Sequence, residues 1–343
     1  MRIGVLTGGG DAPGLNAAIR AVARRAFQYG YQVCGIQNGW LGLIEGQMTE
    51  FTRYSVSGIM HTGGTLLGAT RTNVFAVPDG VQRVLGTMKA RGLDAVVVIG
   101  GIDTLGIAQR LYEEHDAPLV GIPKTIDNNV PGTDQCIGFN SAVATIAEAL
   151  DKLHTTASAH SRAIVVEVMG RESGWLATVG GLAGGADFIV IPEVPTTVGE
   201  ICEHLRRRAE AGKHHSIIVV AEGAHLSDLP NEPEPGAPDA FGRPRMDLRG
   251  IGEAVAQAIE KCAEFEARFV VIGHLQRGGT PTVFDRVLAT RMGVRAVDLI
   301  REGRFGQMTA LHGNKIEPVP LSVLKAGVRQ VDLDLYRLAQ VFF

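Results

Sequence analysis

Short runs of β-branched and aliphatic residues recur along the chain, and longer stretches with helical periodicity separate them. The runs occupy the ranges 2–6, 32–36, 95–99, 119–122, 163–168, 188–191, 216–221 and 269–272. Two of the separating stretches, 15–27 and 142–153, keep their apolar residues on one helix face. This alternation is typical of a parallel sheet that is covered by helices on both faces. The sequence therefore predicts an α/β fold.

The length of 343 residues favours two domains, since a domain takes about 150 residues. Hydrophobic residues make up 45% of the chain and charged residues 20%, which excludes a disordered protein and allows a sizeable aliphatic core. Together with the alternating pattern, this indicates two α/β lobes.

Charge and hydropathy exclude two classes of partner. The formal net charge of −3 is too balanced for a general nucleic-acid binder. No apolar run approaches the roughly 18 residues of a membrane span, and 1–10 reads as a strand entering a glycine turn. We expect a cytoplasmic protein. The cysteines lie far apart without metal-binding spacing, so reduced structural thiols are expected at Cys34, Cys136, Cys202 and Cys262.

Glycines gather at three junctions where a predicted strand ends, in 5–16, 96–106 and 270–281. Such turns let backbone N–H groups approach an anion, and ligands of open α/β sheets bind at the carboxyl ends of strands. A tight left-handed turn also requires glycine, so one junction alone has an explanation without a ligand. Three together favour phosphate. The third glycine of G-x-G-x-x-G is missing after 2–6, and no GxxxxGK[ST] is present, so neither a dinucleotide fold nor a P-loop fits.

The loop in 121–134 carries groups suited to phosphoryl transfer. Asp127 could act as a general base for an alcohol, and Lys124 beside it could neutralise phosphate charge. Asp127 could equally cap a helix that starts near Asn140 or form an Asx turn.

Five arginines lie near glycines or predicted strand ends, which suits bidentate phosphate binding better than surface solvation. They are Arg71, Arg162, Arg171, Arg268 and Arg277. In contrast, the range 228–245 holds five prolines and no periodicity, and we interpret it as an exposed connector in preference to a functional lid.

At these residues the sequence closely resembles the 6-phosphofructokinase family. The motifs GGDAPGLNAAIR, PKTIDN, MGRESGW and GHLQRGGTP occur in the family's order, and the resemblance covers nearly the whole chain. It implies two Rossmann-like three-layer α/β/α domains with the active site in a cleft between them. We expect a phosphoryl-donor domain at 1–138, with about 255–305 packing back onto it. A sugar-phosphate domain at 139–343 would carry the proline-rich surface excursion at 228–245.

The resemblance also implies a role for each matching residue. Asp127 would take the proton from the 1-hydroxyl of fructose 6-phosphate, and Thr125 would help to hold the transferred phosphoryl group. The expected catalytic set is completed by Lys124, Asp103 and Arg171. Donor-binding residues would be Gly10, Arg71, Gly101, Asp103, Thr104 and Lys124. Sugar-phosphate-binding residues would be Thr125, Asp127, Arg162, Met169, Gly170, Arg171, Glu222, Arg268, His274 and Arg277. Arg162 and Arg268 would act from a neighbouring subunit of a homodimer or homotetramer.

Two positions favour pyrophosphate as the donor. Family members that use ATP usually have glycines where this chain has Asp103 and Lys124. A carboxylate there would repel the α-phosphate of ATP, while an ammonium group could neutralise a short inorganic donor. The resemblance thus implies reversible transfer from pyrophosphate to fructose 6-phosphate, giving fructose 1,6-bisphosphate, in glycolysis or gluconeogenesis. The alternatives are an ATP-dependent 6-phosphofructokinase and a weakly catalytic, sugar-phosphate-binding regulatory paralogue.

The expected Mg²⁺ site departs from the family pattern. Ile102 stands where the family has an acidic residue, and Asn129 replaces the second aspartate of TIDND. Isoleucine cannot ligate a hard cation. Magnesium would then be held by Asp103 or Asp127 together with water and the donor's own oxygens. We therefore expect weakened or altered metal binding and reduced activity within an intact fold, whether the chain is a paralogue or an altered version of a parent with both acids.

Overall fold

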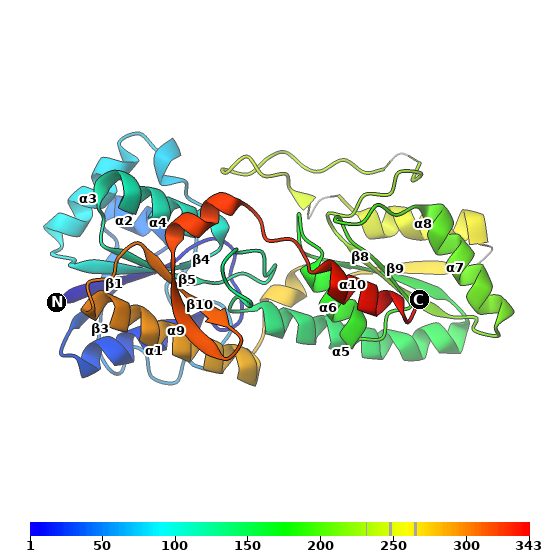
Figure 1. Cartoon of the computed structure of the whole chain (residues 1–343), viewed down its shortest axis with the longest axis horizontal. Coiled ribbons are helices and arrows are strands. Elements are labelled where there is room, and N and C mark those ends of the chain that lie inside the picture. The colour runs from blue at the N-terminus through cyan, green and yellow to red at the C-terminus, as the bar shows by residue number, and fades with distance from the viewer. Residues whose placement is uncertain (231, 247–248, 264–265) are drawn as a thin grey trace. The chain divides into compact units, whose positions relative to one another are not determined.

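The computed structural model describes the whole chain except residues 231, 247–248 and 264–265. The chain forms two compact units (Figure 1). Unit 1 comprises Met1–Ser141 and Arg277–Val328, and unit 2 comprises Ala142–Gln276 and Arg329–Phe343. The later segment that packs with the N-terminal part of unit 1 is Arg277–Val328. The segment expected from the sequence was about 255–305.

Unit 1 is built on a seven-stranded sheet with the order β11-β10-β5-β4-β1-β2-β3. Its strands are β1 (Arg2–Thr7), β2 (Gln32–Ile36), β3 (Met48–Phe51), β4 (Ala95–Gly100), β5 (Leu119–Pro123), β10 (Gln307–His312) and β11 (Lys315–Pro320). The five central strands run parallel, but β3 and β11 are antiparallel to their neighbours. The predicted parallel sheet is confirmed in the five central strands, and one antiparallel strand is added at each edge.

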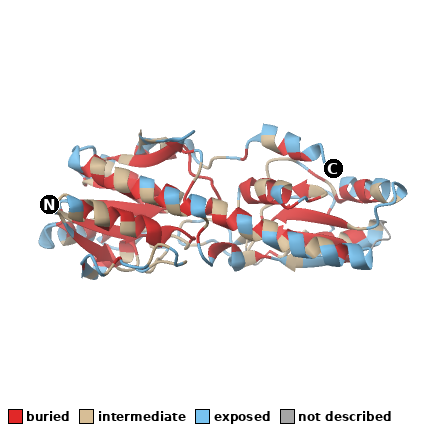
Figure 2. Ribbon diagram, turned by 90° about the horizontal axis from the view of Figure 1, so that it is seen from below, coloured by how far each residue is buried: buried red, intermediate tan, exposed pale blue. Residues whose placement is uncertain are grey.

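Helices cover both faces of this sheet, as Figure 1 shows. One face carries α1 (Leu15–Gln28) and α9 (Val283–Arg301), and the other carries α2 (Trp40–Glu45), α3 (Gly80–Ala90) and α4 (Ile102–His115). The short 3₁₀ helices are η1 (Val74–Ala76) and η4 (Leu321–Ala326). The core consists of apolar residues of α1, α9 and the central strands. Figure 2 shows these strands as almost wholly buried.

Unit 2 has a four-stranded parallel sheet with the order β7-β8-β6-β9. Its strands are β6 (Ala163–Val168), β7 (Phe188–Val190), β8 (Ser216–Ala221) and β9 (Ala267–Val271). Its helices are α5 (Phe139–His160), which starts at the end of unit 1, α6 (Trp175–Ala183), α7 (Val198–Glu210), α8 (Ile251–Ala263), η3 (Gly273–Arg277) and α10 (Leu333–Gln340). All eight runs predicted from the sequence form strands, and α1 and α5 contain the two predicted helical stretches.

The cysteines correct one prediction. Cys202 on α7 and Cys262 on α8 form a disulfide although 60 residues separate them. The reason is tertiary, because α7 packs against α8 and brings the two Cα atoms to 6.2 Å. Cys34 and Cys136 are free and buried, as expected.

Among the residues that the structure describes, no helix combines the length and the apolar character that crossing a bilayer requires.

Candidate active site

The predicted donor residues gather at the carboxyl edge of the unit 1 sheet. Strands β1, β4 and β5 are neighbours, and Thr7 pairs with Ile99 while Gly100 pairs with Pro123. The glycine turns after β1 and β4 and the 124–129 loop after β5 therefore begin side by side. The amide of Gly8 donates to the Ile99 carbonyl at 3.0 Å and joins the first two turns.

Two of these glycines are required by the packing of Thr104 in the first turn of α4. A Cβ on Gly8 would lie 2.7 Å from the Thr104 Cγ2, and one on Gly100 would lie 2.4 Å from the Thr104 Cβ. Thr104 is buried and β-branched, so it cannot move aside cheaply. The turns after β1 and β4 thus pack closely against the same side chain, which leaves no room for a Cβ at Gly8 or Gly100.

Lys124 extends from the end of β5 into the turn after β1. Its side chain is fully buried, and its Nζ donates to the Gly8 carbonyl at 2.9 Å and also to the Gly10 carbonyl. Burial and, to a smaller extent, the positive charge of Arg277 lower the pKa of Lys124 to about 7, although the carboxylates of Asp11 and Asp127 oppose the change. The structure thus holds a desolvated amine in the predicted donor loop.

Arg277 contacts the same turn. A Cβ on Gly10 would lie 2.6 Å from the Arg277 Nη1, and this nitrogen donates to the Asp11 carbonyl at 3.3 Å. Arg277 belongs to unit 1. The structure therefore places Arg277 against the same glycine turn that Lys124 contacts.

The predicted base lies in the loop that follows β5. Asp127 is 7% exposed, and its backbone amide donates to the Thr125 Oγ1 at 3.2 Å. Because the Thr125 hydroxyl accepts this bond, its own proton stays available for a phosphoryl oxygen. Asn129 is also buried in this loop, and Arg71 is exposed.

The first turn of α4 carries the remaining donor-side residues. Gly101 precedes the helix, Ile102 begins it, and Asp103 is the acidic residue of its first turn, where a carboxylate interacts favourably with the helix dipole. Ile102 is partly exposed, so an apolar side chain stands where the family places a metal ligand.

The implied magnesium ion would have to be held by oxygen atoms of the first turn of α4 and of the loop after β5. Mg²⁺ usually takes one or two carboxylates together with substrate phosphates and water. Asp103 and Asp127 follow neighbouring strands and supply two carboxylates at one sheet edge. Within the described part of the chain, no three His, Cys, Asp or Glu side chains are grouped to hold a metal ion. The residues fit an ion that is carried mainly by the donor's phosphates.

The predicted sugar-phosphate residues of unit 2 meet at a small cavity of about 120 Å³. Met169, Glu222 and His274 line it, although they follow three different strands, β6, β8 and β9. Parallel strands end at one sheet edge, which explains why residues so distant in sequence converge.

Glu222 holds the loop after β6 in place. Its Oε1 accepts from the amides of Gly170 at 3.3 Å and Arg171 at 3.0 Å. Gly170 has φ of 143°, and a Cβ there would lie 2.6 Å from the Ser173 carbonyl oxygen, so this position requires glycine. Arg171 has φ of 51°, a left-handed conformation that costs energy for a residue with a side chain.

Glu167 lines the same cavity and escaped the sequence analysis. It is buried within β6, and its Oε2 accepts from the Gly252 amide at 2.8 Å near the start of α8. Burial raises the pKa of its carboxyl group. A lone acid within the otherwise aliphatic run of β6 was the signal that could have revealed it.

Arg162 and Arg268 do not join this cavity. Arg162 precedes β6, and Arg268 lies near the start of β9, so both are at the amino ends of strands whose carboxyl ends carry Met169 and His274. Six residues of β6 span roughly 17 Å. Both arginines form ion pairs with Glu266, Arg162 at 2.8 Å.

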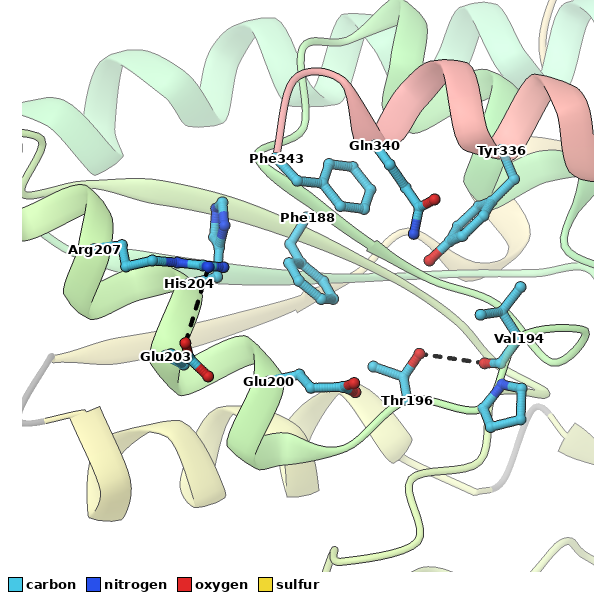
Figure 3. A pocket seen from close by; sticks show the side chains of 11 residues that line it. Phe188, Val194, Thr196, Glu200, Glu203, His204, Arg207, Tyr336, Gln340 and Phe343 are labelled. Carbon is cyan, nitrogen blue, oxygen red and sulfur yellow. Dashed lines mark hydrogen bonds and ion pairs between the residues drawn. The ribbon is translucent and has the colours of Figure 1, made fainter.

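A larger cavity of unit 2, of about 390 Å³, lies beside α7 and α10 (Figure 3). Phe188 stacks on Phe343 with ring centroids 5.0 Å apart, and His204 and Tyr336 also line the cavity. None of the predicted site residues lines this cavity, so it is separate from the candidate active site.

Comparison with known proteins agrees with this geometry. The chain is 48% identical over 344 residues to the pyrophosphate–fructose 6-phosphate 1-phosphotransferase of Streptomyces coelicolor, with all of both chains covered. It is 42% identical to the enzyme of that name from Dictyoglomus thermophilum, covering 100% of this chain and 99% of the relative. ATP-dependent 6-phosphofructokinase 3 of Streptomyces coelicolor is 46% identical over 94% of each chain.

Solved structures give the same fold. The phosphofructokinase of Saccharomyces cerevisiae matches with a TM-score of 0.80 and 33% identity over 94% of this chain and 45% of that one. A pyrophosphate-dependent phosphofructokinase from Marinobacter aquaeolei matches with a TM-score of 0.83 at 22% identity over 97% of this chain and 86% of that one, which supports the fold alone. The phosphofructokinase family profile matches residues 2–300. With the predicted donor and sugar-phosphate residues gathered as described, this chain belongs to the phosphofructokinase family.

Proposed function

We propose that this protein transfers a phosphoryl group from pyrophosphate to the 1-hydroxyl of fructose 6-phosphate, reversibly, giving fructose 1,6-bisphosphate and inorganic phosphate. The observation that carries the proposal is the buried amine of Lys124 between the carbonyls of Gly8 and Gly10. It fills the donor loop at a position where the family resemblance implies glycine in members that use ATP. Relatives named as pyrophosphate-dependent match over their full length at 48% and 42% identity, and a relative named as ATP-dependent also does so at 43%, so the choice of donor rests on Lys124.

In this proposal Lys124 serves the donor. A diphosphate carries several negative charges in a small volume, and a desolvated amine responds strongly to such charge. Because its pKa is about 7 in the free protein, binding of the diphosphate raises the pKa and draws a proton onto the amine. Gly10, Arg71, Gly101 and Thr104 complete the donor-binding set.

Asp127 serves the acceptor as general base. As the bond between the transferred phosphorus and the bridging oxygen of pyrophosphate breaks, the C1 oxygen forms the new ester bond and its proton passes to the Asp127 carboxylate. The Thr125 hydroxyl donates to an oxygen of the phosphoryl group while this group is transferred. Positioning and charge neutralisation supply most of the rate enhancement in such a reaction.

Asp103 and Asp127 would hold Mg²⁺ together with oxygens of the diphosphate. When bound, the ion neutralises phosphate charge. Ile102 leaves the ion with one carboxylate fewer than the family pattern supplies, so the proposed enzyme needs a high magnesium concentration.

The residues proposed to bind the sugar phosphate are Met169, Gly170, Arg171, Glu222, His274 and Arg277. Arg162 and Arg268 lie at the far ends of their strands from the unit 2 cavity, and this placement supports a role in a neighbouring subunit of a homodimer or homotetramer. The proposed setting is the cytoplasm.

The test measures fructose 1,6-bisphosphate formation with pyrophosphate, with ATP and with neither donor, across a range of magnesium concentrations. We expect product with pyrophosphate alone. Product only with ATP would assign the protein to the ATP-dependent class, and tight binding of fructose 6-phosphate without product from either donor would indicate a regulatory paralogue. Asp127→Asn keeps the shape of the side chain and removes the base, so it should lower kcat by about 10³-fold.

A further inference from the structure

The proline-rich excursion forms a hairpin between β8 and α8 (Figure 1). Gly236 and Arg245 form an antiparallel bridge, in which the Gly236 amide donates to the Arg245 carbonyl at 2.9 Å. Nearer the tip, the Asp239 amide donates to the Arg243 carbonyl at 2.9 Å. These backbone bonds define a hairpin over 236–245. The prediction of an exposed connector did not include this internal hydrogen bonding.

The base of the hairpin is tied to the predicted sugar-phosphate site. The buried Arg249 donates from its Nη1 to the Glu222 carbonyl at 3.1 Å and from its Nε to the Pro233 carbonyl at 2.8 Å. Its Nη2 pairs with Glu232. Since the Glu222 carboxylate in turn holds the amide of Arg171, one guanidinium connects the start of the hairpin with the loop after β6.

The tip of the hairpin contacts this loop directly. An Asp239 Oδ2 lies 3.6 Å from the Nη2 of Arg171, and both side chains are largely buried, at 9% and 18% exposure. Beside this pair, the Arg243 Nη1 lies 3.7 Å from the Glu172 Oε1. The hairpin is therefore bound to two consecutive residues of the MGRESGW motif.

The Asp239 carboxylate is oriented by its own hairpin. Its Oδ1 accepts from the amides of Phe241 at 2.9 Å and Arg243 at 3.2 Å. The other oxygen faces the guanidinium of Arg171. A guanidinium binds a carboxylate and a phosphate with the same N–H donors, so the carboxylate occupies the kind of position that a phosphate of the substrate would take.

We propose that Asp239 is an internal competitor for the sugar phosphate. It holds Arg171 in the free protein, and the phosphorylated sugar must displace it, so the hairpin 236–245 sets the affinity of the site for its sugar substrate. This role rests on the proposed function, because it takes Arg171 as a ligand of the sugar phosphate. Asp239 acts through Arg171 and does not touch the reacting atoms.

The test compares Asp239→Asn with wild type. Asparagine keeps the Oδ1 acceptor of the hairpin and removes the charge that faces Arg171, so the hairpin bonds survive. Loss of one partly buried ion pair in the free state should lower the Kd for fructose 6-phosphate, measured by calorimetry without a donor, by about three- to tenfold. The KM for fructose 6-phosphate should fall similarly while kcat stays within about twofold.

Glu234→Gln is the matched control, because Glu234 is an exposed acid of the same excursion and loses the same charge. It should leave both Kd and KM at the wild-type values. An equal decrease in Glu234→Gln would assign the effect to net charge and overturn the role of Asp239. A Kd for Asp239→Asn that equals or exceeds that of wild type would also overturn it.

Hydrogen exchange of the wild-type protein keeps the proposal testable if the variant does not fold. Fructose 6-phosphate should speed exchange of the amides in 236–245, and unchanged or slower exchange would contradict displacement. The Kd measurement needs no turnover, so it tests the competitor role of Asp239 separately from the proposed enzymatic function. Turnover with an unaltered Kd in Asp239→Asn refutes the competitor alone, and absence of fructose 6-phosphate binding in both proteins refutes the proposed function and the competitor with it.

Discussion

The two halves of the candidate site hold positive charge in different ways. In unit 1 the amine of Lys124 is buried against two backbone carbonyls, within turns whose glycines pack closely against Thr104. In unit 2 Arg171 is paired with the carboxylate of Asp239. Arg268 lies at the far end of β9 from the cavity, is about half exposed and is paired with Glu266. Carbonyl dipoles neutralise the charge of an ammonium group less completely than a carboxylate partner would. The removal of the ammonium group from water adds a further free-energy cost to its charged form.

Under the proposed function, this difference corresponds to two modes of anion binding. The donor half would be preformed, and its amine would gain a strong partner when the anion arrives. The sugar-phosphate half already contains anionic side chains, so the substrate phosphate would enter by exchange with them. Substitutions that change packing should affect the preformed donor half most strongly. Substitutions that change charge should affect the sugar-phosphate half, where a carboxylate already pairs with the arginine.

The largest expected effect concerns the packing of the donor half. Gly100→Ala places a Cβ 2.4 Å from the Thr104 Cβ, and the clash with a buried β-branched residue should lower the free energy of unfolding by about 2–3 kcal/mol. Urea denaturation measures it. Gly86→Ala is the control, since a Cβ at this exposed helical position meets nothing within 4 Å, and it should stabilise by about 0.5–1 kcal/mol. A neutral Gly100→Ala would show that the donor turns are not closely packed against Thr104.

The pH dependence of stability probes the buried amine of Lys124. Between its pKa of about 7 and the ordinary value of 10.5, the unfolded chain binds the proton and the folded protein does not, so rising pH favours the folded state. From pH 7 to pH 9, wild type should gain up to about 1.4 kcal/mol per pH unit relative to Lys124→Met.

The exposed Lys152 on α5 supplies the control for this experiment. The difference between wild type and Lys152→Met should stay flat over the same pH range. A flat difference for Lys124→Met as well would mean that the amine keeps its proton when buried, and the contrast between the two halves would then weaken.

The fold was largely predictable because buried parallel strands read as aliphatic runs, as in 95–99 and 216–221. The strands missed are β3, β10 and β11, which carry polar residues. Two prolines, Pro318 and Pro320, lie in the edge strand β11, where proline is tolerated. β3 and β11 are edge strands and lack the double burial that produces a recognisable run. β10 is an inner, buried strand, but the polar Thr309 interrupts its apolar residues.

The site was predictable only in part, for a similar reason. Lys124 and Asp127 stand in one short motif, so local sequence indicated them. The contacts of Glu167 with α8 and of Asp239 with Arg171 join residues more than 60 positions apart. Such contacts depend on how loops meet in the folded protein, and no local pattern predicts them.

A smaller effect is expected at the start of α4, where Ile102 replaces an acid. Ile102→Glu adds an oxygen ligand and also a negative charge near a helix N-terminus, where it interacts favourably with the dipole. We expect turnover to rise several-fold and the magnesium concentration for half-maximal rate to fall. Ile102→Gln, which adds a weaker neutral ligand, should lie between wild type and the glutamate variant. Unchanged turnover and magnesium dependence in Ile102→Glu would show that the ion is held without this position.

The smallest effect on stability is expected at Glu266, whose carboxylate pairs with Arg162 and Arg268. These groups are partly exposed, so Glu266→Gln should leave the midpoint of urea denaturation close to that of wild type, like the exposed control Glu148→Gln, which loses the pair with Lys152. If the arginines bind a phosphate by exchange, the same variant should lower the KM for fructose 6-phosphate by about two- to threefold at low salt. The difference should shrink as salt screens the charges. A stability loss near that of Gly100→Ala, with KM unchanged, would instead make this cluster structural, and the two halves of the site would then differ in burial alone.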